Sequence, residues 1–297
     1  MNEIKENGAC ERAETDRNEA DLGYFYGFGH GRYLEALAEL RAHGGVNSAL
    51  TSSIPLAQFW RPANLSRITG VLAPYLPGFN AEKALKFFEF PTDAMSEGRR
   101  IGRPSMTDLM LLANGWQIAI EAKFTEYSRM SSETVGAWLQ KNPANDALRR
   151  LVGRTWLRYI QDAGCSGLVG TQRLYDACGE VGYQFLHRAA SACFKTNGND
   201  GQKPALVYQL FFDAADSKSI ADRNRFAQEL ESWAKTLRLR NMKFLILSVP
   251  VLNASEVVER FPSADGEIFS RLASESVYRF DFDHITVEDV PLEGEAC

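Results

Sequence analysis

The chain has 297 residues, of which 45% are hydrophobic, and it carries a formal net charge of −5. It contains no apolar run of the roughly eighteen residues that a membrane-spanning helix needs, and its acidic, polar beginning lacks the hydrophobic part of a signal peptide. Five scattered cysteines without a CxxC pair or a histidine at ligand spacing indicate neither a zinc motif nor a disulfide framework, so we expect reduced thiols and a cytoplasmic protein.

Charge is distributed unevenly along the chain. Residues 1–21 hold seven acids and three bases, and residues 276–297 hold six acids and one base. The two ends therefore carry −4 and −5, and the rest of the chain carries +4, which suits contact with nucleic-acid phosphates. Dense charge and few large apolar side chains predict a disordered acidic tail over 1–21.

Short helical elements are expected between this tail and the core domain. Residues 23–31 are rich in glycine and aromatic side chains but lack the setting of a phosphate loop, so they predict an irregular packed segment. A helix is expected over 32–42, and four prolines among apolar residues in 54–80 indicate short helices and turns. We therefore expect a helical N-terminal region over 22–80, packed on a core domain over 81–290.

Residues 81–88 have the composition of a helix, and the proline at position 91 predicts that an extended segment follows it. Glu89 is a lone acid among three phenylalanines, and an acid in such surroundings needs a partner. Two interpretations stay open here. Glu89 is either a surface glutamate at a helix end or an additional carboxylate of a functional site.

Residues 105–126 predict a β-hairpin. Two apolar, strand-like runs flank Asn114 and Gly115, the dipeptide best suited to a two-residue type I′ turn because both positions tolerate positive φ. A two-residue turn fixes the pairing of the strands. Counting outward from it, Asp108 on the first strand faces Glu121 on the second.

Three polar side chains gather on one face of this hairpin. Side chains alternate along a strand, so Lys123 lies on the same face as Glu121. Opposed Cβ atoms are about 5 Å apart, and two carboxylates at that distance are unfavourable unless a cation such as Mg²⁺ lies between them. The amine could orient or deprotonate a water or hold a phosphate. The set predicts a phosphodiester-cleaving site, and the structural alternative is a pair of solvated acids on an open hairpin face.

The second half of the chain alternates between helical and strand-like segments. Helices are expected within 128–147 and over 148–161, 181–194 and 223–239, and strands over 205–212, 243–251 and 280–287. A strand, a helix and a strand at this spacing imply a right-handed crossover and a parallel pair. Together with the antiparallel hairpin they predict an α/β fold with a mixed central β-sheet flanked by helices.

Asp108 and the tripeptide Glu121-Ala122-Lys123, twelve residues further on, resemble the PD-(D/E)xK nuclease superfamily. The sequence departs from the family pattern at the proline, because Thr107 precedes the aspartate. The resemblance implies a restriction-endonuclease-like core and a Mg²⁺ or Mn²⁺ ion held by Asp108, Glu121 and the carbonyl of Ala122. It also implies that Lys123 assists the attacking water or stabilises the phosphate.

The same resemblance points to two more site residues. Glu89 is the candidate for an extra carboxylate from an early element. Gln184, on the helix expected over 181–194, is the candidate for a helix residue that reaches the active site, and His187 and Arg188 lie within about one turn of it. The commoner explanation of Gln184 and His187 is helix packing.

Arginines flank the predicted site. Three precede the Asp108 strand in a predicted polar loop, and others share one face of the helix expected over 148–161. Each alone fits an ordinary loop or a solvated helix face, but as a set beside a metal-binding hairpin they suit phosphate contacts. The predicted nucleic-acid-binding residues are Arg99, Arg100, Arg103 and Arg154.

We therefore predict a metal-dependent nuclease that hydrolyses phosphodiester bonds in DNA. By resemblance its setting is restriction, host defence or DNA processing, with a homodimer or a defence-system protein as further partners and no membrane contact. One alternative is a catalytically silent nuclease fold that acts as a nucleic-acid-binding or assembly subunit. Another is an interaction module whose acidic tails dock a basic partner while the hairpin is merely structural.

Overall fold

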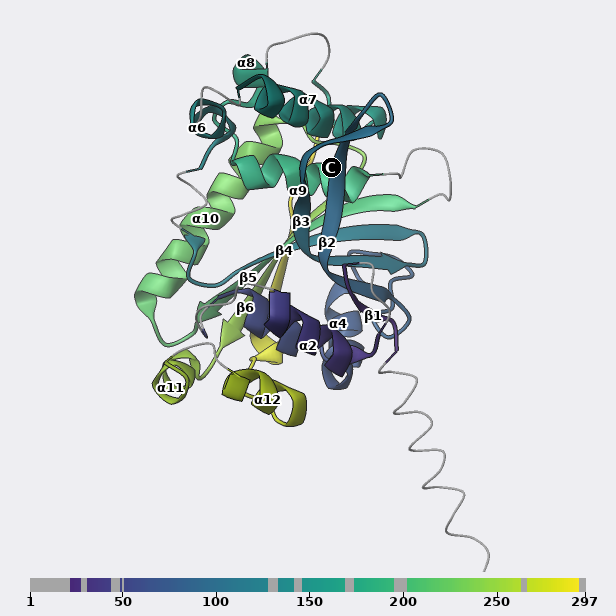
Figure 1. Ribbon diagram of the computed structural model, residues 1–297. Coiled ribbons are helices and arrows are strands. Elements are labelled where there is room, and N and C mark those ends of the chain that lie inside the picture. The colour runs from purple at the N-terminus through teal and green to yellow at the C-terminus, as the bar shows by residue number, and fades with distance from the viewer. Residues whose placement is uncertain are drawn as a thin grey trace, which may run out of the picture.

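The computed structural model describes residues 22–27, 31–43, 49, 51–127, 133–141, 146–168, 174–194, 202–262 and 266–293. The acidic tail predicted over 1–21 lies outside these residues. The described elements form an α/β fold in which one seven-stranded mixed sheet has helices on both faces (Figure 1). The predicted fold class, a mixed central sheet flanked by helices, is confirmed.

The strands lie side by side in the order in which they follow along the chain. They are β1 (Tyr24–Tyr26), β2 (Leu85–Ser96), β3 (Arg99–Ala113), β4 (Trp116–Lys123), β5 (Lys203–Asp213), β6 (Lys243–Val251) and β7 (Thr286–Asp289). The pairs β2–β3, β3–β4 and β6–β7 are antiparallel, whereas β1–β2, β4–β5 and β5–β6 are parallel. The parallel pairing of β5 and β6 was predicted from the succession of strand, helix and strand.

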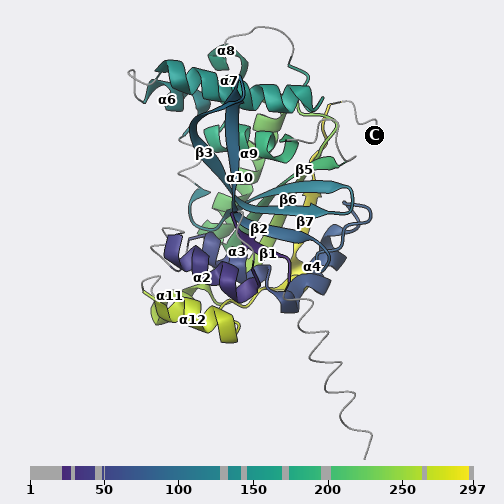
Figure 2. The same cartoon turned by 45° about the vertical axis from the view of Figure 1, so that its right-hand side comes forward.

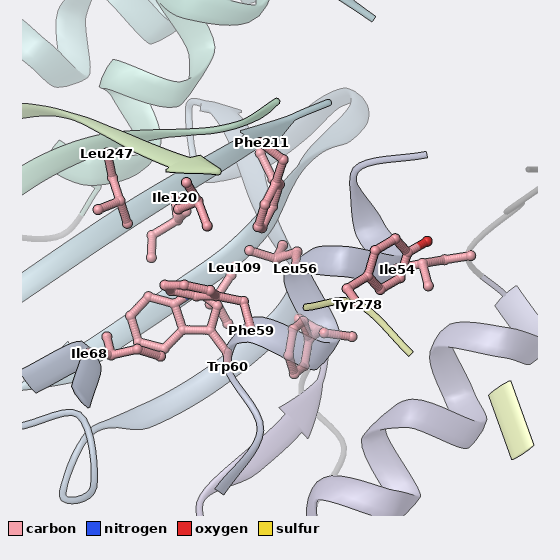
Figure 3. Close-up of a cluster of buried hydrophobic side chains, with 14 of the residues drawn as sticks. Ile54, Leu56, Phe59, Trp60, Ile68, Leu109, Ile120, Phe211, Leu247 and Tyr278 are labelled. Atoms are coloured by element: carbon pink, nitrogen blue, oxygen red, sulfur yellow. The ribbon is translucent and has the colours of Figure 1, made fainter. Parts of the chain in front are cut away.

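One face of the sheet packs on helices from both ends of the described chain. These are α2 (Tyr33–His43), α3 (Ser53–Phe59), α4 (Leu65–Leu72), α11 (Ala254–Arg260) and α12 (Gly266–Ser274), with the 3-10 turns η1 (Pro62–Asn64) and η3 (Phe282–His284). Figure 3 shows the centre of this layer, where Trp60 and Phe59 lie against the strand residues Leu109, Ile120 and Phe211. All five side chains are fully buried. This layer contains more buried apolar residues than the layer on the other face, so it is the larger apolar core.

The other face carries the crossover helices. These are α6 (Val135–Gln140), α7 (Asp146–Asp162), α8 (Leu174–Cys178), α9 (Tyr183–Cys193) and α10 (Ser217–Thr236). Figures 1 and 2 show α9 and α10 on the sheet and α7 across the far end of the long β2–β3 hairpin. Met110 and Ala119 of the central strands pack into this second core with residues of α9.

The predicted hairpin and its register are confirmed. Ala113 pairs with Trp116, and the ladder continues outward to Leu109 and Ile120. The turn type differs from the prediction, because Gly115 has a φ of 73° while Asn114 is absent from the residues with positive φ. A type I′ turn needs positive φ at both positions, so the two-residue loop is retained with a different backbone conformation.

The helix predicted over 81–88 is wrong, because Leu85 already begins strand β2. Residues of β2 pair with β1 on one side and β3 on the other, and this pairing outweighs the helical composition of the segment. The polar loop predicted for Arg99, Arg100 and Arg103 is also wrong, since all three belong to β3. The last strand is shorter than predicted: Phe280 forms only an isolated bridge, to Val251.

The region over 22–80 contains the expected helices, and it also contributes β1 to one edge of the sheet. In the part of the chain that the structure describes, no helix combines the length and the apolar character needed to cross a membrane.

Candidate active site

Asp108 and Glu121 lie one step beyond the last ladder pair of β3 and β4, on the face covered by α9. The backbone N–H of Ala122 donates a hydrogen bond to Oδ2 of Asp108 at 2.8 Å. This bond joins the two strands at the position where regular pairing ends. The in-register placement of the two carboxylates therefore agrees with the geometry expected from the turn.

Glu121 is a buried acid whose two oxygens both have cationic partners. Its side chain is 1% exposed, and Nζ of Lys123 lies 2.6 Å from Oε1. Nε of Arg188 donates to Oε2. Lys123, two residues along the same strand, thus lies beside Glu121 as the alternation of side chains requires.

Arg188 is the residue that joins the helix layer to the hairpin. It projects from α9, its side chain is 5% exposed, and its Nη2 lies 3.7 Å from Oδ1 of Asp108. Its Nη1 donates to Oγ of Ser105 at 3.0 Å and approaches Nδ1 of His187 at 2.9 Å. Ser105 and His187 are themselves hydrogen-bonded, so the guanidinium group is fixed from several sides.

Sequence reasoning placed Arg188 near Gln184 and His187 but did not include it in the site. The available signal was the helical spacing of the three residues. Spacing on one helix does not show which strands the helix crosses, and the partner Ser105 lies 83 positions away in the sequence. A long-range contact of this kind has no local pattern that could reveal it.

Glu89 and Tyr208 extend the polar row across the sheet. The pairs Phe88–Leu109 and Phe90–Thr107 flank the step at which Glu89 faces Asp108. Glu89 has a φ of 49°, an uncommon conformation for a residue inside a strand.

On the other side of the hairpin, Tyr208 of β5 pairs with Glu121. Its hydroxyl is buried and has no hydrogen-bond partner within the described residues. Glu89, Asp108, Glu121 and Tyr208 therefore follow one another across four adjacent strands.

Burial and mutual repulsion set the protonation of the acids. Burial, reinforced by the charge of Glu121, raises the pKa of Asp108 to about 8. Burial raises the pKa of Glu89 to about 6, with Glu121 adding to the rise and Arg188 opposing it. Burial alone would raise the pKa of Glu121, but Arg188 and Lys123 outweigh it and hold that pKa below its ordinary value. Glu121 is therefore ionised at neutral pH, whereas Asp108 is mostly protonated.

The basic members respond in the opposite sense. Burial opposes the charged form of Lys123, but Glu121 and Asp108 outweigh it and raise its pKa. Burial, together with the charges of Arg188 and Lys123, keeps the pKa of His187 well below its ordinary value. His187 is therefore neutral, which allows its Nδ1 to accept a hydrogen bond.

With all groups ionised, the three acids Glu89, Asp108 and Glu121 face two bases, so the cluster carries one excess negative charge. Within the described residues, no three His, Cys, Asp or Glu side chains are grouped so as to hold a metal ion. Mg²⁺ in proteins commonly uses one or two carboxylates and keeps several waters, so Asp108 and Glu121 fit such an ion in their chemistry. In their present positions the guanidinium of Arg188 lies between them.

Gln184 lies on α9 four residues before Arg188. Its Oε1 is buried without a hydrogen-bond partner in the described part of the chain. Glu126, beyond the end of β4, accepts hydrogen bonds from Ser52 and from the backbone N–H of Phe124. It supports the loop after β4.

The arginines predicted to bind nucleic acid lie at the far end of the β2–β3 hairpin. Arg99, Arg100 and Arg103 are exposed, and Arg103 is five residues before Asp108, roughly 17 Å along the strand. Arg154 is exposed on α7.

The helix α7 is joined to the same end of the hairpin. Tyr159 on α7 donates a hydrogen bond to the carbonyl of Asp93 at 3.0 Å and accepts one from the N–H of Met95 at 2.9 Å. The four predicted arginines therefore lie on α7 and on β3, the partner of the strand to which α7 is hydrogen-bonded.

Fold and site together define an α/β protein in which a mixed seven-stranded sheet and one crossing helix enclose a cluster of three carboxylates and two basic side chains. The chain belongs to the family described as Domain of unknown function (DUF6946), which matches residues 35–249. This span contains every residue of the cluster. No curated protein and no solved structure matches the chain.

Proposed function

We propose that the protein is a metal-dependent nuclease that hydrolyses phosphodiester bonds in DNA. The observation that carries this proposal is the convergence of Asp108, Glu121 and Lys123 on one face of the β3–β4 hairpin. Two carboxylates and an amine in this arrangement are the groups that a phosphodiester-cleaving site needs. The antiparallel strands β2–β3–β4 followed by the parallel strand β5 agree with the sheet expected around such a site.

Each residue has a distinct part in the proposed reaction. Asp108 and Glu121 would hold a Mg²⁺ or Mn²⁺ ion, with the Ala122 carbonyl as a further ligand, and the bound ion would supply Lewis acidity toward water and phosphate. Lys123 would orient the attacking water and offset charge on the phosphate. Glu89, next in the row, would add negative charge on the side of Asp108 away from Glu121.

DNA contact is assigned to the exposed arginines of the β2–β3 hairpin and α7. Phosphate contacts of this kind give affinity without reading sequence. Arg154→Gln is expected to weaken binding to all DNA sequences alike and to reduce the salt dependence of the binding constant by about one unit of slope. Exposed Lys83, in the turn before β2, provides Lys83→Gln as a charge-matched control.

Cleavage of defined DNA tests the proposal. Circular and linear, single- and double-stranded DNA would be incubated with Mn²⁺ and wild-type protein, Asp108→Asn, or the exposed-site control Glu97→Gln. We expect cleavage by wild type and control and none by Asp108→Asn. Lys123→Met should lower the rate by roughly 10²-fold or more. Circular dichroism would confirm that each variant is folded, and equal cleavage by wild type and Asp108→Asn would overturn the proposal.

A second candidate is a catalytically silent nuclease fold that binds nucleic acid or assembles with other subunits. The observation in its favour is that both oxygens of the buried Glu121 side chain are bonded to basic side chains, Oε1 to Lys123 and Oε2 to Arg188. If this candidate is right, the wild-type protein shifts DNA in a mobility-shift assay and the arginine variants do not. The DNA also stays uncut with every divalent ion tested.

A further inference from the structure

Arg188 lies in a position that a bound cation would also need. Its Nε donates to Oε2 of Glu121, and its Nη2 is 3.7 Å from Oδ1 of Asp108. Its Nη1 is within 3.0 Å of Ser105 and His187. All three nitrogens of the guanidinium group therefore face members of the site, and the side chain has almost no contact with solvent.

Two neighbouring buried carboxylates are unfavourable without a positive charge between them. Arginine suits this task because it stays protonated in proteins and because its planar group can serve two acids at once. Removing it would leave Glu121 in a dry environment with Lys123 as its remaining charged partner. Arg188 thus performs, in the protein alone, the neutralising task that a divalent ion would otherwise have.

The guanidinium group and an ion cannot share this space. An ion such as Mg²⁺ lies about 2.0–2.1 Å from its oxygen ligands, and an ion bound by both Asp108 and Glu121 must lie between them. The Nη2 side of Arg188 lies between the same two residues. Ion binding therefore requires that at least this side of the group move away from Asp108.

We propose that Arg188 is a built-in competitor of the divalent ion: it occupies the gap between Asp108 and Glu121, and the ion must displace it to bind. This inference rests on the proposed function and adds its regulation. Ser105 and His187 hold Nη1 and thereby set how readily the group leaves. The site consequently has a weaker affinity for divalent ions than its carboxylates alone would give.

Isothermal titration with Mn²⁺ tests this without measuring activity. We expect Arg188→Met to bind Mn²⁺ at least about tenfold more tightly than wild type, because the ion no longer has to displace a positively charged group from the gap between the two carboxylates. Ser105→Ala keeps the charge and loosens its anchor, so it should tighten binding by a smaller factor. Ser191→Ala is the matched control, since this buried serine of α9 bonds to the carbonyl of His187 rather than to Arg188.

Thermal unfolding provides a second readout. Without Mn²⁺, Arg188→Met should unfold several degrees below wild type, because Glu121 loses a buried ionic partner. Saturating Mn²⁺ should raise its Tm by more than it raises the Tm of wild type. If Arg188→Met does not fold, the titration of Ser105→Ala against Ser191→Ala decides the matter by itself.

The outcomes separate this inference from the proposed function. If wild type binds Mn²⁺ and Asp108→Asn does not, while the Arg188 and Ser105 variants bind no more tightly than wild type, the competitor role is overturned and the nuclease proposal stands. If neither wild type nor any of these variants binds Mn²⁺, both are overturned. Tighter binding in Arg188→Met or Ser105→Ala, with Ser191→Ala unchanged, supports the competitor role.

Discussion

The side-chain amide of Gln117 donates a hydrogen bond to the carbonyl of Ser191 at 2.9 Å. The same Nε2 also lies 3.1 Å from the carbonyl of Ala192 and 2.8 Å from that of Phe194. Carbonyls in the last turn of a helix have no partner within the helix, and here a strand residue supplies one. Gln117 thereby fastens the end of α9, which carries Arg188, to β4, which carries Glu121.

Gln117→Met should destabilise the protein by about 1–3 kcal/mol, because it removes the amide that lies within hydrogen-bond distance of the carbonyls of Ser191, Ala192 and Phe194. Urea unfolding measures the change in the free energy of unfolding. Gln161→Met is the control, since Gln161 bonds to a single loop carbonyl, that of Leu168. A loss for Gln117→Met no larger than that of the control would contradict this role.

Gly182→Ala should destabilise the protein by about 1–3 kcal/mol. Gly182 is the N-cap of α9, and a Cβ at this position would lie 2.6 Å from Cη2 of Trp233. Gly70→Ala is the control: Gly70 lies in α4 with nothing within 4 Å of such a Cβ, so alanine should stabilise by roughly 0.5–1 kcal/mol. Differential scanning calorimetry should show Tm shifts of opposite sign, and shifts of the same sign would contradict the packing argument.

Lys86→Met should stabilise the protein at pH 7. Lys86 is fully buried, donates to the carbonyl of Ala84 and lies 4.6 Å from the ring centroid of Tyr24. Burial lowers its pKa from 10.5 to about 8, which corresponds to a cost of roughly 3 kcal/mol for the charged form.

The pH dependence of unfolding tests this assignment. Between pH 8 and pH 10.5 the unfolded chain keeps a proton on Lys86 that the folded protein releases, so wild-type stability gains from rising pH in this window. The advantage of Lys86→Met over wild type should therefore shrink between pH 7 and pH 10. Lys83→Met, at an exposed position, should show no such trend, and an advantage that grows with pH would refute the assignment.

Asp108→Asn should stabilise the protein most at high pH. The folded pKa of Asp108, about 8, lies above its ordinary value of 3.8, so the folded state holds a proton that the unfolded chain releases between these values. The protonated carboxyl group stabilises the folded state. This stabilisation is complete below pH 3.8 and is lost as pH rises through 8. Asparagine keeps the shape of the protonated form and can still accept from the N–H of Ala122.

The measurement is the difference in Tm between Asp108→Asn and wild type from pH 4 to pH 9, without divalent ions. The difference should grow as pH rises and should level off above pH 8. Glu97→Gln, in an exposed turn, serves as the control. A difference that is constant over this range would show that Asp108 keeps its ordinary pKa in the folded protein.

The central hairpin could be predicted because its signals are local. Asn114 and Gly115 end two apolar runs, and a two-residue loop fixes every pair beyond it, so the opposition of Asp108 and Glu121 followed by counting. The helices α7, α9 and α10 followed from their periodicity. The prediction of a type I′ turn was wrong, although the predicted register of the two strands is correct.

What could not be predicted depends on partners far away in the sequence. The segment 81–88 has helical composition, but Leu85–Phe88 becomes a strand because β1 and β3 pair with it from both sides. The same holds for Arg188, whose partner Glu121 lies 67 residues earlier. Periodicity shows which face of a helix is buried, but it does not show which residues will lie beneath that face.

Sheet order that equals chain order has a consequence for synthesis on the ribosome. Each strand emerges next to the strand that it will pair with, so the sheet can grow at one edge without waiting for later segments. Gln58 departs from this order, because its amide exchanges hydrogen bonds with the backbone of Tyr278, 220 residues further on. A nascent chain that has assembled β1 through β6 therefore still exposes this amide, and the layer around Trp60 closes only when the segment after α12 arrives.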